Sequence, residues 1–328
     1  MVPSFPIKKY FRYGTASDFP NISKELELGP VLGKGSFAMV YKAIDLTQGI
    51  QVAVKVYEKK NLMHREKKQF VQTEIDVMGQ IDHPHISKFY RVIEDNKAVF
   101  LVQERCGDRS LSEYVKRSKG RRLEELEARV IFKQFIGALR YLHQKNICHR
   151  DLKLTNILID KCSSKSIDDM SLVYKVKLID FGFAIVSTRK YRTYCGTPSY
   201  MAPELVNRVS YDGIKVDIWA VGVILYKLVT GEYPFGSEKD KNLDTKIKEV
   251  TIEFPEYVST ECRDLILKCL KADPNERISA RSIESHSWVV YNKKFPKYGD
   301  SEQTCPETSK PDPVPEPKNP SVIADNNE

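Results

Sequence analysis

Lys55 and Glu74 are the two charged residues whose surroundings most suggest a chemical role. Lys55 closes the apolar run VAVK, which has the composition of a strand, and Glu74 stands at the centre of an apolar-striped helical segment. A carboxylate that faces a core is costly unless a cation meets it, so we expect the two side chains to pair and the lysine to reach phosphate oxygens. The alternative is an edge lysine with its ammonium in solvent.

Residues 33–40, GKGSFAMV, supply a glycine-rich segment between two predicted strands. Glycines let a backbone approach phosphates closely and offer amide donors without side-chain clashes. A glycine-rich hairpin turn explains the segment equally well on its own. Ala38 also stands where a third glycine would complete the pattern G-x-G-x-x-G.

Three further motifs follow along the chain: HRDLKLTN at residues 149–156, DFG at 180–182 and APE at 202–204. The first comes directly after a long predicted helix and before the apolar run ILI. Each short string could arise by chance, but chance does not explain all of them in this order after GKGSFAMV and VAVK.

The elements that must position these motifs change character along the chain. From about residue 26 to 102 β-type runs dominate, and after residue 105 the apolar spacing becomes helical, with residues 216–229 apolar nearly all round. This change predicts two lobes that join near residues 103–110, where a ligand cleft is favoured. The helical stripes comprise Phe70, Val71, Glu74, Ile75, Met78 and Ile81, then Ile131, Phe135, Leu139 and Leu142, and finally Leu265, Ile266, Cys269 and Leu270.

The combination of motifs resembles the catalytic domain of eukaryotic serine/threonine protein kinases over residues 26–290. The resemblance implies an α+β, bilobal protein kinase fold, with an antiparallel sheet plus one helix in the N-lobe (26–103) and a mainly helical C-lobe (107–290). We expect an irregular N-terminal leader over 1–25 and a disordered, proline-rich acidic tail over 291–328. GKGSFA is nearest to polo-like kinases, with calcium/calmodulin-dependent and AMP-activated-like kinases as close competitors.

The resemblance implies transfer of the γ-phosphoryl group of Mg-ATP to serine or threonine hydroxyls of protein substrates. Asp151 matches the catalytic base, and Lys153 matches the lysine that steadies the transferring group. HRDLK is the serine/threonine form of this loop, whereas tyrosine kinases normally carry another. Asn156 and Asp180 match the two side chains that hold Mg²⁺, which prefers oxygen ligands.

The nucleotide site follows from the same matching. Lys55, with Glu74 as its partner, matches the lysine that binds the α- and β-phosphates. The backbone of Glu104 and Cys106 would make the hinge hydrogen bonds, with Gln103 at the gatekeeper position. The remaining predicted nucleotide contacts are Leu32, Val40 and Ala53 above the adenine, Leu158 below it, and Gly33, Lys34, Gly35, Ser36, Phe37, Ala38, Met39 and Asp180 near the phosphates.

Residues 180–204 match the activation segment of the family. Thr193 lies where relatives often carry an activating phosphate, added by an upstream kinase or by a second copy of the enzyme in trans. Arg150 is expected to receive that phosphate, because an arginine beside the catalytic aspartate otherwise lacks a partner. Thr188 is the second choice, and the alternative for Thr193 is an exposed loop hydroxyl. Thr197 matches a structural threonine that contacts the catalytic aspartate and lysine.

Two contacts are expected to support the helical lobe. Glu204 should form a buried ion pair with Arg277. Asp217, at the start of the buried helix, should accept hydrogen bonds from the backbone near His149 and Arg150.

The positions that select peptides depart from those of basophilic kinases. Ser110, Thr155 and Lys227 stand where such kinases often carry acids, so we do not expect a strong preference for arginine two residues before the target. Lys227 itself is expected to be solvated, and the alternative is that it favours acidic residues near the target. Residues 289–299 are basic but interrupted by Pro296, so we do not expect calmodulin as a partner.

Residues 161–175 lengthen a connection that is a short hairpin in most relatives. We expect a tolerated surface insertion, because added loop length costs little. The alternative is a docking or autophosphorylation loop that uses Ser163, Ser164 and Ser166.

Composition excludes several other classes of protein. The chain has 328 residues and a net charge of +8, with acids and bases alternating, so we do not expect nucleic acid as a partner. Seven cysteines without CxxC spacing argue against a disulfide framework or a zinc site. The most apolar stretch, residues 216–230, is interrupted by Asp217 and Lys227 and is too short to span a bilayer. We expect an intracellular, cytoplasmic protein, with nuclear or centrosomal sites also open.

Two other functions compete with an active protein kinase. A pseudokinase would normally lack Lys55, Asp151, Asn156 or Asp180, and all four are present. A small-molecule phosphotransferase of the same fold would not need the peptide platform GTPSYMAPE.

Overall fold

The computed structural model describes residues 24–35, 38–161, 174–187 and 190–290, which all lie in one compact unit, residues 1–291. The predictions for Ser36, Phe37, Thr188, most of the leader, the inserted serines and the tail fall outside these residues. No helix within the described ranges is long and apolar enough to cross a membrane.

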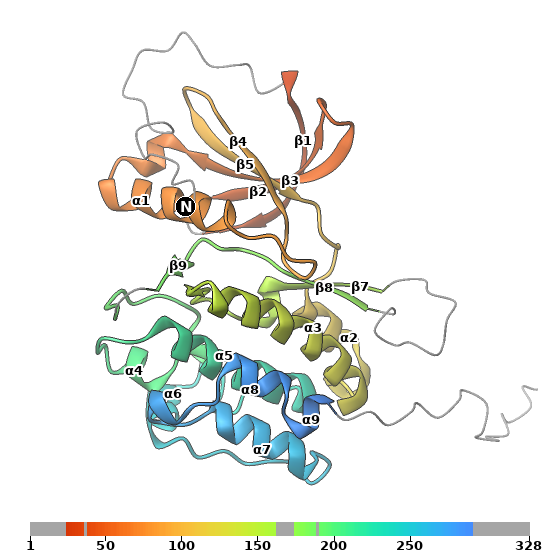
Figure 1. Ribbon diagram of the computed structural model, residues 1–328, viewed down its shortest axis with the longest axis vertical. Helices are drawn as coiled ribbons and strands as arrows, with labels where there is room; N and C mark the ends of the chain where they lie inside the picture. Colours follow the sequence, from red (N-terminus) through yellow and green to blue (C-terminus); the bar gives the residue numbers. More distant parts are fainter. Residues whose placement is uncertain (1–23, 36–37, 162–173, 188–189, 291–328) are drawn as a thin grey trace, which may run out of the picture. The chain divides into compact units, whose positions relative to one another are not determined.

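A five-stranded antiparallel sheet forms the N-terminal lobe, in the order β1-β2-β3-β5-β4 (Figure 1). It agrees with the β-type runs in the sequence. The register places Lys55 opposite Val40 on one side and Leu101 on the other. Its strands are β1 (Leu26–Lys34), β2 (Met39–Asp45), β3 (Ile50–Glu58), β4 (Phe89–Glu94) and β5 (Ala98–Glu104).

Helix α1 (Arg65–Met78) follows the short 3-10 helix η3 (Lys59–Leu62) and buries Val71, Glu74 and Met78. The prediction of one buried helical stripe from Phe70 to Ile81 is wrong at both ends of the stripe. Phe70 remains 38% exposed, since one residue turns the helix by about 100° away from the buried row. Ile81 is buried but lies beyond Gly79, which caps the helix.

The C-terminal lobe is helical and is built around α5 (Gly213–Thr230). This helix is buried on nearly all sides, as its apolar composition predicts, and the stripe of α3 (Glu125–Gln144) is buried as well. The other helices of this lobe, apart from one in the central loop, are α2 (Leu111–Arg117), η4 (Lys119–Arg121), η7 (Pro198–Tyr200), α4 (Pro203–Val206), α6 (Leu243–Glu249), α7 (Thr260–Cys269), η8 (Pro274–Glu276), α8 (Ala280–Glu284) and α9 (Ser287–Val290).

Two small antiparallel ribbons position the central motifs. β6 (Ile147–Cys148) pairs with β9 (Ile185–Val186), and β7 (Ile157–Lys161) pairs with β8 (Tyr174–Leu178). The loop 149–156, which ends in the 3-10 helix η5 (Leu154–Asn156), lies between β6 and β7, and residues 180–182 lie between β8 and β9. The ribbons therefore hold HRDLKLTN and DFG side by side.

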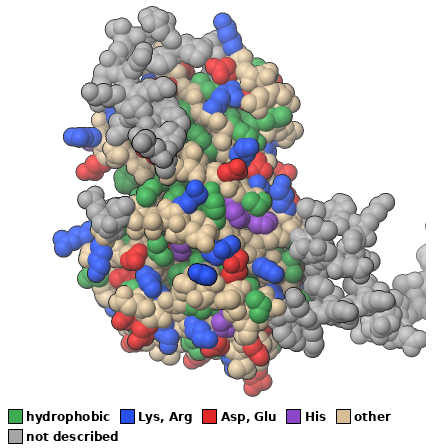
Figure 2. Space-filling model, viewed as in Figure 1, with side chains coloured by type: hydrophobic (Ala, Val, Ile, Leu, Met, Phe, Trp, Pro, Cys, Tyr) green, Lys and Arg blue, Asp and Glu red, His purple; other side chains and the backbone are tan. Residues whose placement is uncertain are grey.

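The visible face of the molecule carries charges of both signs. Figure 2 shows Lys and Arg interspersed with Asp and Glu over this face. The pattern matches the alternation of charges along the sequence.

Candidate active site

A cavity of about 870 Å³ lies where the sheet meets the helical lobe. This volume falls in the usual range for sites that hold a small ligand. Met39 does not line it, because successive strand residues point to opposite faces and its neighbours Ala38 and Val40 take the cavity side. The predicted residues that line the cavity are Leu32, Gly33, Lys34, Gly35, Ala38, Val40, Ala53, Lys55, Gln103, Glu104, Cys106, Asp151, Lys153, Asn156, Leu158 and Asp180.

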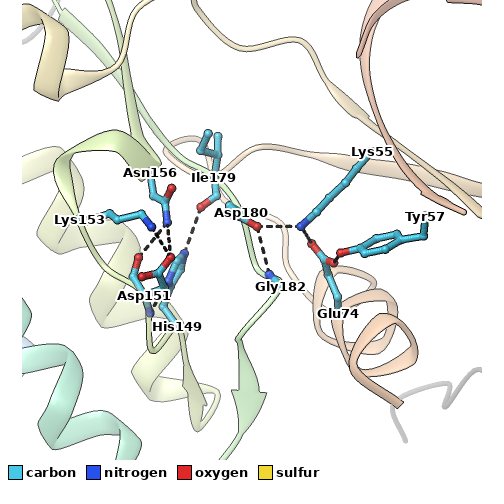
Figure 3. Close-up of polar contacts among 10 residues, drawn as sticks. All are labelled: Lys55, Tyr57, Glu74, His149, Asp151, Lys153, Asn156, Ile179, Asp180 and Gly182. Carbon is cyan, nitrogen blue, oxygen red and sulfur yellow. Dashed lines mark hydrogen bonds and ion pairs between the residues drawn. The ribbon is translucent and has the colours of Figure 1, made fainter. Parts of the chain in front are cut away.

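Lys55 joins the two lobes through its ammonium group (Figure 3). Its Nζ lies 2.7 Å from Glu74 Oε1 on α1 and 2.7 Å from Asp180 Oδ1 in the DFG motif. The positive charge of Lys55 is the largest influence on Asp180 and lowers the pKa of its carboxyl to about 2. Burial opposes the charge on Lys55, but Glu74, Tyr57 and Asp180 outweigh it and raise the lysine pKa. The predicted pair of Lys55 with Glu74 is therefore present.

Gly182 lies in close contact with this cluster. A Cβ on this residue would lie 3.2 Å from Lys55 Nζ and 3.3 Å from Asp180 Oδ1. Its own N–H donates to Asp180 Oδ1 at 3.4 Å. The glycine therefore lets the chain turn beside the ion pair without displacing it.

Tyr57 is a member of the cluster that sequence reasoning missed. It lies two residues after Lys55 on β3, and its hydroxyl donates a hydrogen bond to Oε2 of Glu74 (Figure 3). The strand period of two places residues 55 and 57 on the same face. The spacing of two residues along a predicted strand could therefore have indicated that Tyr57 lies beside Lys55.

Asp151 is held by three donors in the loop 149–156 and the activation segment. Its Oδ2 lies 2.7 Å from Lys153 Nζ and 3.2 Å from Asn156 Nδ2, and its Oδ1 accepts from Thr197 Oγ1 at 3.0 Å. Lys153 Nζ also donates to Thr197 Oγ1 at 3.0 Å. The expected contact of Thr197 with this aspartate and lysine is present, and together these contacts hold a carboxylate that is largely buried.

Asp217, on α5, holds the backbone of the loop 149–156. Its two carboxylate oxygens accept from His149 N at 2.9 Å and Arg150 N at 2.8 Å, as predicted. The His149 ring accepts from Asp151 N through Nδ1 at 3.3 Å and, with its proton assigned to Nε2, donates to Ile179 O at 3.1 Å. The histidine thus connects the loop to the strand that leads into DFG.

Asn156 and Asp180 offer suitable oxygens to a magnesium ion. Asn156 uses its Nδ2 on the backbone and side chain of Asp151, which leaves its Oδ1 to face a ligand. Within the described residues Asp180 Oδ2 has no hydrogen-bond partner, and the low pKa keeps this carboxylate ionised. Two protein oxygens suit a cation that takes its other ligands from phosphates and water. The described residues contain no cluster of three or more His, Cys, Asp or Glu that could hold a metal.

The hinge between the lobes is braced by Glu104. Its carboxylate accepts from Lys177 Nζ at 2.6 Å and from Lys88 N at 3.0 Å, a contact that the sequence did not indicate. Burial raises the pKa of Cys106 to about 12, so this hinge residue is a neutral thiol. Gln103 lines the cavity from β5, next to the hinge.

Arg150 does not lack a partner, so the reason given for its role as a phosphate receptor is wrong. Its Nε donates to Phe183 O at 2.8 Å and its Nη1 to Tyr211 Oη at 3.0 Å. Tyr211 in turn donates to the backbone carbonyl of Thr193 at 2.8 Å and pairs through its backbone with Tyr191. The side chain of Thr193 is exposed.

Two other predictions concern the helical lobe. Arg277 meets Glu204 through two contacts of 2.7 Å, and both side chains are buried, as expected. Lys227 is not simply solvated, because its Nζ lies 3.5 Å from the centroid of the Tyr233 ring. Burial lowers the pKa of Lys227.

Comparison with known proteins places this geometry in a family. The protein kinase domain family matches residues 26–289. A probable serine/threonine-protein kinase of Dictyostelium discoideum is 36% identical over 81% of this chain and 31% of its own length. The serine/threonine-protein kinase PLK4 of Xenopus laevis is 36% identical over 79% of the chain and 26% of its own length. The serine/threonine protein kinase OSK3 of Oryza sativa subsp. indica is 38% identical over 84% of the chain and 52% of its own length. The chain thus spans about half or less of these relatives.

Proposed function

The chain belongs to the protein kinase family and is a protein serine/threonine kinase, and on this premise we propose that it uses Mg-ATP with Asp151 as the catalytic base. The single observation that carries the proposal is the continuous set of polar contacts from Glu74 through Lys55 to Asp180, facing Asp151 across one cavity (Figure 3). It brings cations, metal ligands and a base to the same space.

The proposed step is a phosphoryl transfer. The substrate hydroxyl oxygen bonds to the γ-phosphorus, the bond from that phosphorus to the β,γ-bridging oxygen breaks, and the hydroxyl proton passes to Asp151. Lys153, 2.7 Å from the base, balances charge on the transferring group, and Lys55 orients the phosphates behind it. Magnesium, when bound by Asn156 and Asp180, neutralises phosphate charge. The chain's own groups position the reactants and accept the proton.

The first test measures transfer from labelled ATP with Mg²⁺ to a generic basic protein and to the enzyme itself. Asp151→Asn keeps the shape of the base but removes its charge, so we expect transfer to fall by roughly a hundredfold or more. Asp244→Asn, which changes an exposed carboxylate on α6, is the matched control and should retain full activity. Transfer that persists in Asp151→Asn would contradict the assignment of the base.

Activation by phosphorylation at Thr193 is a second part of the proposal. The exposed side chain of Thr193 supports it, and the activator is either an upstream kinase or a second copy of this enzyme. Mass spectrometry of residues 186–200 after incubation with ATP should find phosphate on Thr193, and Thr193→Ala should lower activity. Full activity without phosphate at this residue would disprove the regulatory role and leave the enzymatic one intact.

A further inference from the structure

The buried hydroxyl of Tyr57 contacts Glu74, the ion-pair partner of Lys55, through the carboxylate oxygen that Lys55 does not use. Its partner Glu74 is 1% exposed, with Oε1 bonded to Lys55 and Oε2 to Tyr57. A buried carboxylate needs a donor for each oxygen, because an unsatisfied charged group in the interior is costly. The two strand residues therefore share the carboxylate of α1 between them.

The ring of Tyr57 fixes the direction of that hydroxyl. Tyr57 is only 6% exposed and belongs to the apolar cluster between the sheet and α1 that also contains Val71 and Ile75. These two residues flank Glu74 on the buried side of the helix. Lys55 Nζ also lies 5.5 Å from the ring centroid, within the range of a cation–π contact. The ring of Tyr57 therefore packs against α1, the same helix to which its hydroxyl donates a hydrogen bond.

The hydroxyl is a donor under all ordinary conditions. Burial first, and then the negative charge of Glu74, raise the pKa of Tyr57 well above its usual value. A neutral phenol next to a carboxylate can only donate its proton to it. The Tyr57 hydroxyl therefore remains the donor in this contact at physiological pH.

We propose that Tyr57 is a positioning residue that holds Glu74, and through it Lys55, in the arrangement needed for phosphate binding. It ties α1 to β3 by a bond that involves neither the activation segment nor the substrate. This inference rests on the proposed kinase activity. It adds that a residue of the N-lobe, Tyr57, holds Lys55 and Glu74 in their paired arrangement.

The decisive variant is Tyr57→Phe, which keeps the ring in the core and removes one oxygen. The matched control is Tyr174→Phe, because Tyr174 is 7% exposed and its hydroxyl donates to Glu127 at 2.7 Å, away from the cavity. We expect kcat/KM for ATP to fall roughly tenfold or more in Tyr57→Phe, the scale of a lost hydrogen bond to a charged group. Tyr174→Phe should stay within about twofold of the wild type.

A double-mutant cycle separates positioning from general stability. If Tyr57 acts through Glu74, Tyr57→Phe should have little further effect on kcat/KM in a Glu74→Gln background. Equal losses in both backgrounds, or unchanged kinetics in Tyr57→Phe, would overturn the proposal while leaving the kinase assignment in place.

Hydrogen exchange supplies a readout that does not need turnover. Amides of α1 should exchange faster in Tyr57→Phe than in the wild type, and Tyr174→Phe should not change them. Failure of the wild type to transfer phosphate would count against the proposed function alone, since the exchange of α1 still reports on Tyr57. Unchanged exchange of α1 in Tyr57→Phe would count against the role of Tyr57.

Discussion

Among single residues, Lys227 stands where basophilic kinases often carry an acid, and we propose that it affects which peptides are accepted. Its ammonium lies on the Tyr233 ring, Tyr233 packs edge-to-face with Tyr200 at 5.5 Å, and the Tyr200 hydroxyl accepts from Leu154 N in the loop of the catalytic base. This series of contacts connects the lysine to the catalytic loop. A cation at this position would repel basic residues of a bound peptide substrate.

Reversing that charge should change peptide preference. We expect Lys227→Glu to raise the rate on a peptide with arginine two residues before the acceptor serine by roughly tenfold over its alanine counterpart. The wild type should use the two peptides at similar rates. The measurement is kcat/KM for the peptide pair. A strong arginine preference already present in the wild type would contradict this account.

Residue types and spacing were sufficient to predict contacts between charged groups. The pair of Lys55 with Glu74 follows from the cost of burying a carboxylate, whereas the acceptor role of Asp217 was implied by the resemblance to protein kinases. The partners of Tyr57 and Arg150 were not predictable. A hydroxyl or guanidinium group can find a hydrogen-bond partner in many places. Only the packing of segments that are distant in the sequence decides which partner it contacts.

At the scale of elements, a buried aspartate ties the end of β2 to β4. Asp45 is fully buried, bonds to Arg91, and accepts from Thr47 Oγ1 at 2.6 Å. Burial raises the pKa of Asp45, but the bonds from Arg91 and Thr47 outweigh it and lower the pKa from 3.8 to about 2. The unfolded chain therefore binds this proton at higher pH than the folded one, so the ionised pair stabilises the fold above pH 3.8.

The stability of the sheet should consequently fall as pH drops from about 4 towards 2. We expect this single group to contribute about 2 kcal/mol of that loss in the free energy of unfolding. Asp45→Asn should be less stable at neutral pH but show a shallower fall across this window. Urea unfolding at a series of pH values measures both slopes. Parallel slopes would show that Asp45 is not the titrating group.

The buried pair of Glu204 and Arg277 links the end of the activation segment to the helical lobe. Arg277 also donates to the backbone carbonyls of Lys271 and Lys215, so its loss affects three segments. Arg277→Met should lower the free energy of unfolding by about 3–5 kcal/mol, because it leaves a buried carboxylate unpaired.

Chemical denaturation measures this loss, with Arg281→Met on the exposed side of α8 as the control. A change below about 1 kcal/mol in Arg277→Met, comparable to that of the surface variant, would rule out the predicted contribution.

Element types were predictable wherever the apolar period was long. α3 and α5 satisfy their patterns over four turns or more, whereas the pattern of α1 failed at Phe70 and Ile81. Near helix ends, cap geometry and the neighbouring sheet decide which residues face inwards. The pairings β6 with β9 and β7 with β8 join strands of two to five residues, too short for periodicity to specify.

For the described part of the molecule as a whole, the cavity is lined by residues from both lobes. A nucleotide bound there contacts both, so it should stabilise them together. Mg-ATP at about 100 times its Kd should add about 3 kcal/mol to the free energy of unfolding. Chelating magnesium, or changing Asp180→Asn, should remove much of this gain. Thermal unfolding with and without Mg-ATP measures it, and a gain independent of magnesium would contradict the roles of Asn156 and Asp180.

The hydrogen bond from Tyr211 to the carbonyl of Thr193 also has a thermodynamic consequence. It acts on the backbone, together with the pairing of Tyr211 and Tyr191, so it does not depend on the charge of the threonine side chain. Fixing the backbone of one residue costs about 1–2 kcal/mol in conformational entropy. Here folding already fixes the backbone at Thr193 through these contacts. If Thr193 is phosphorylated as we propose, the phosphate would not have to fix the backbone at this residue, because Tyr211 already holds its carbonyl.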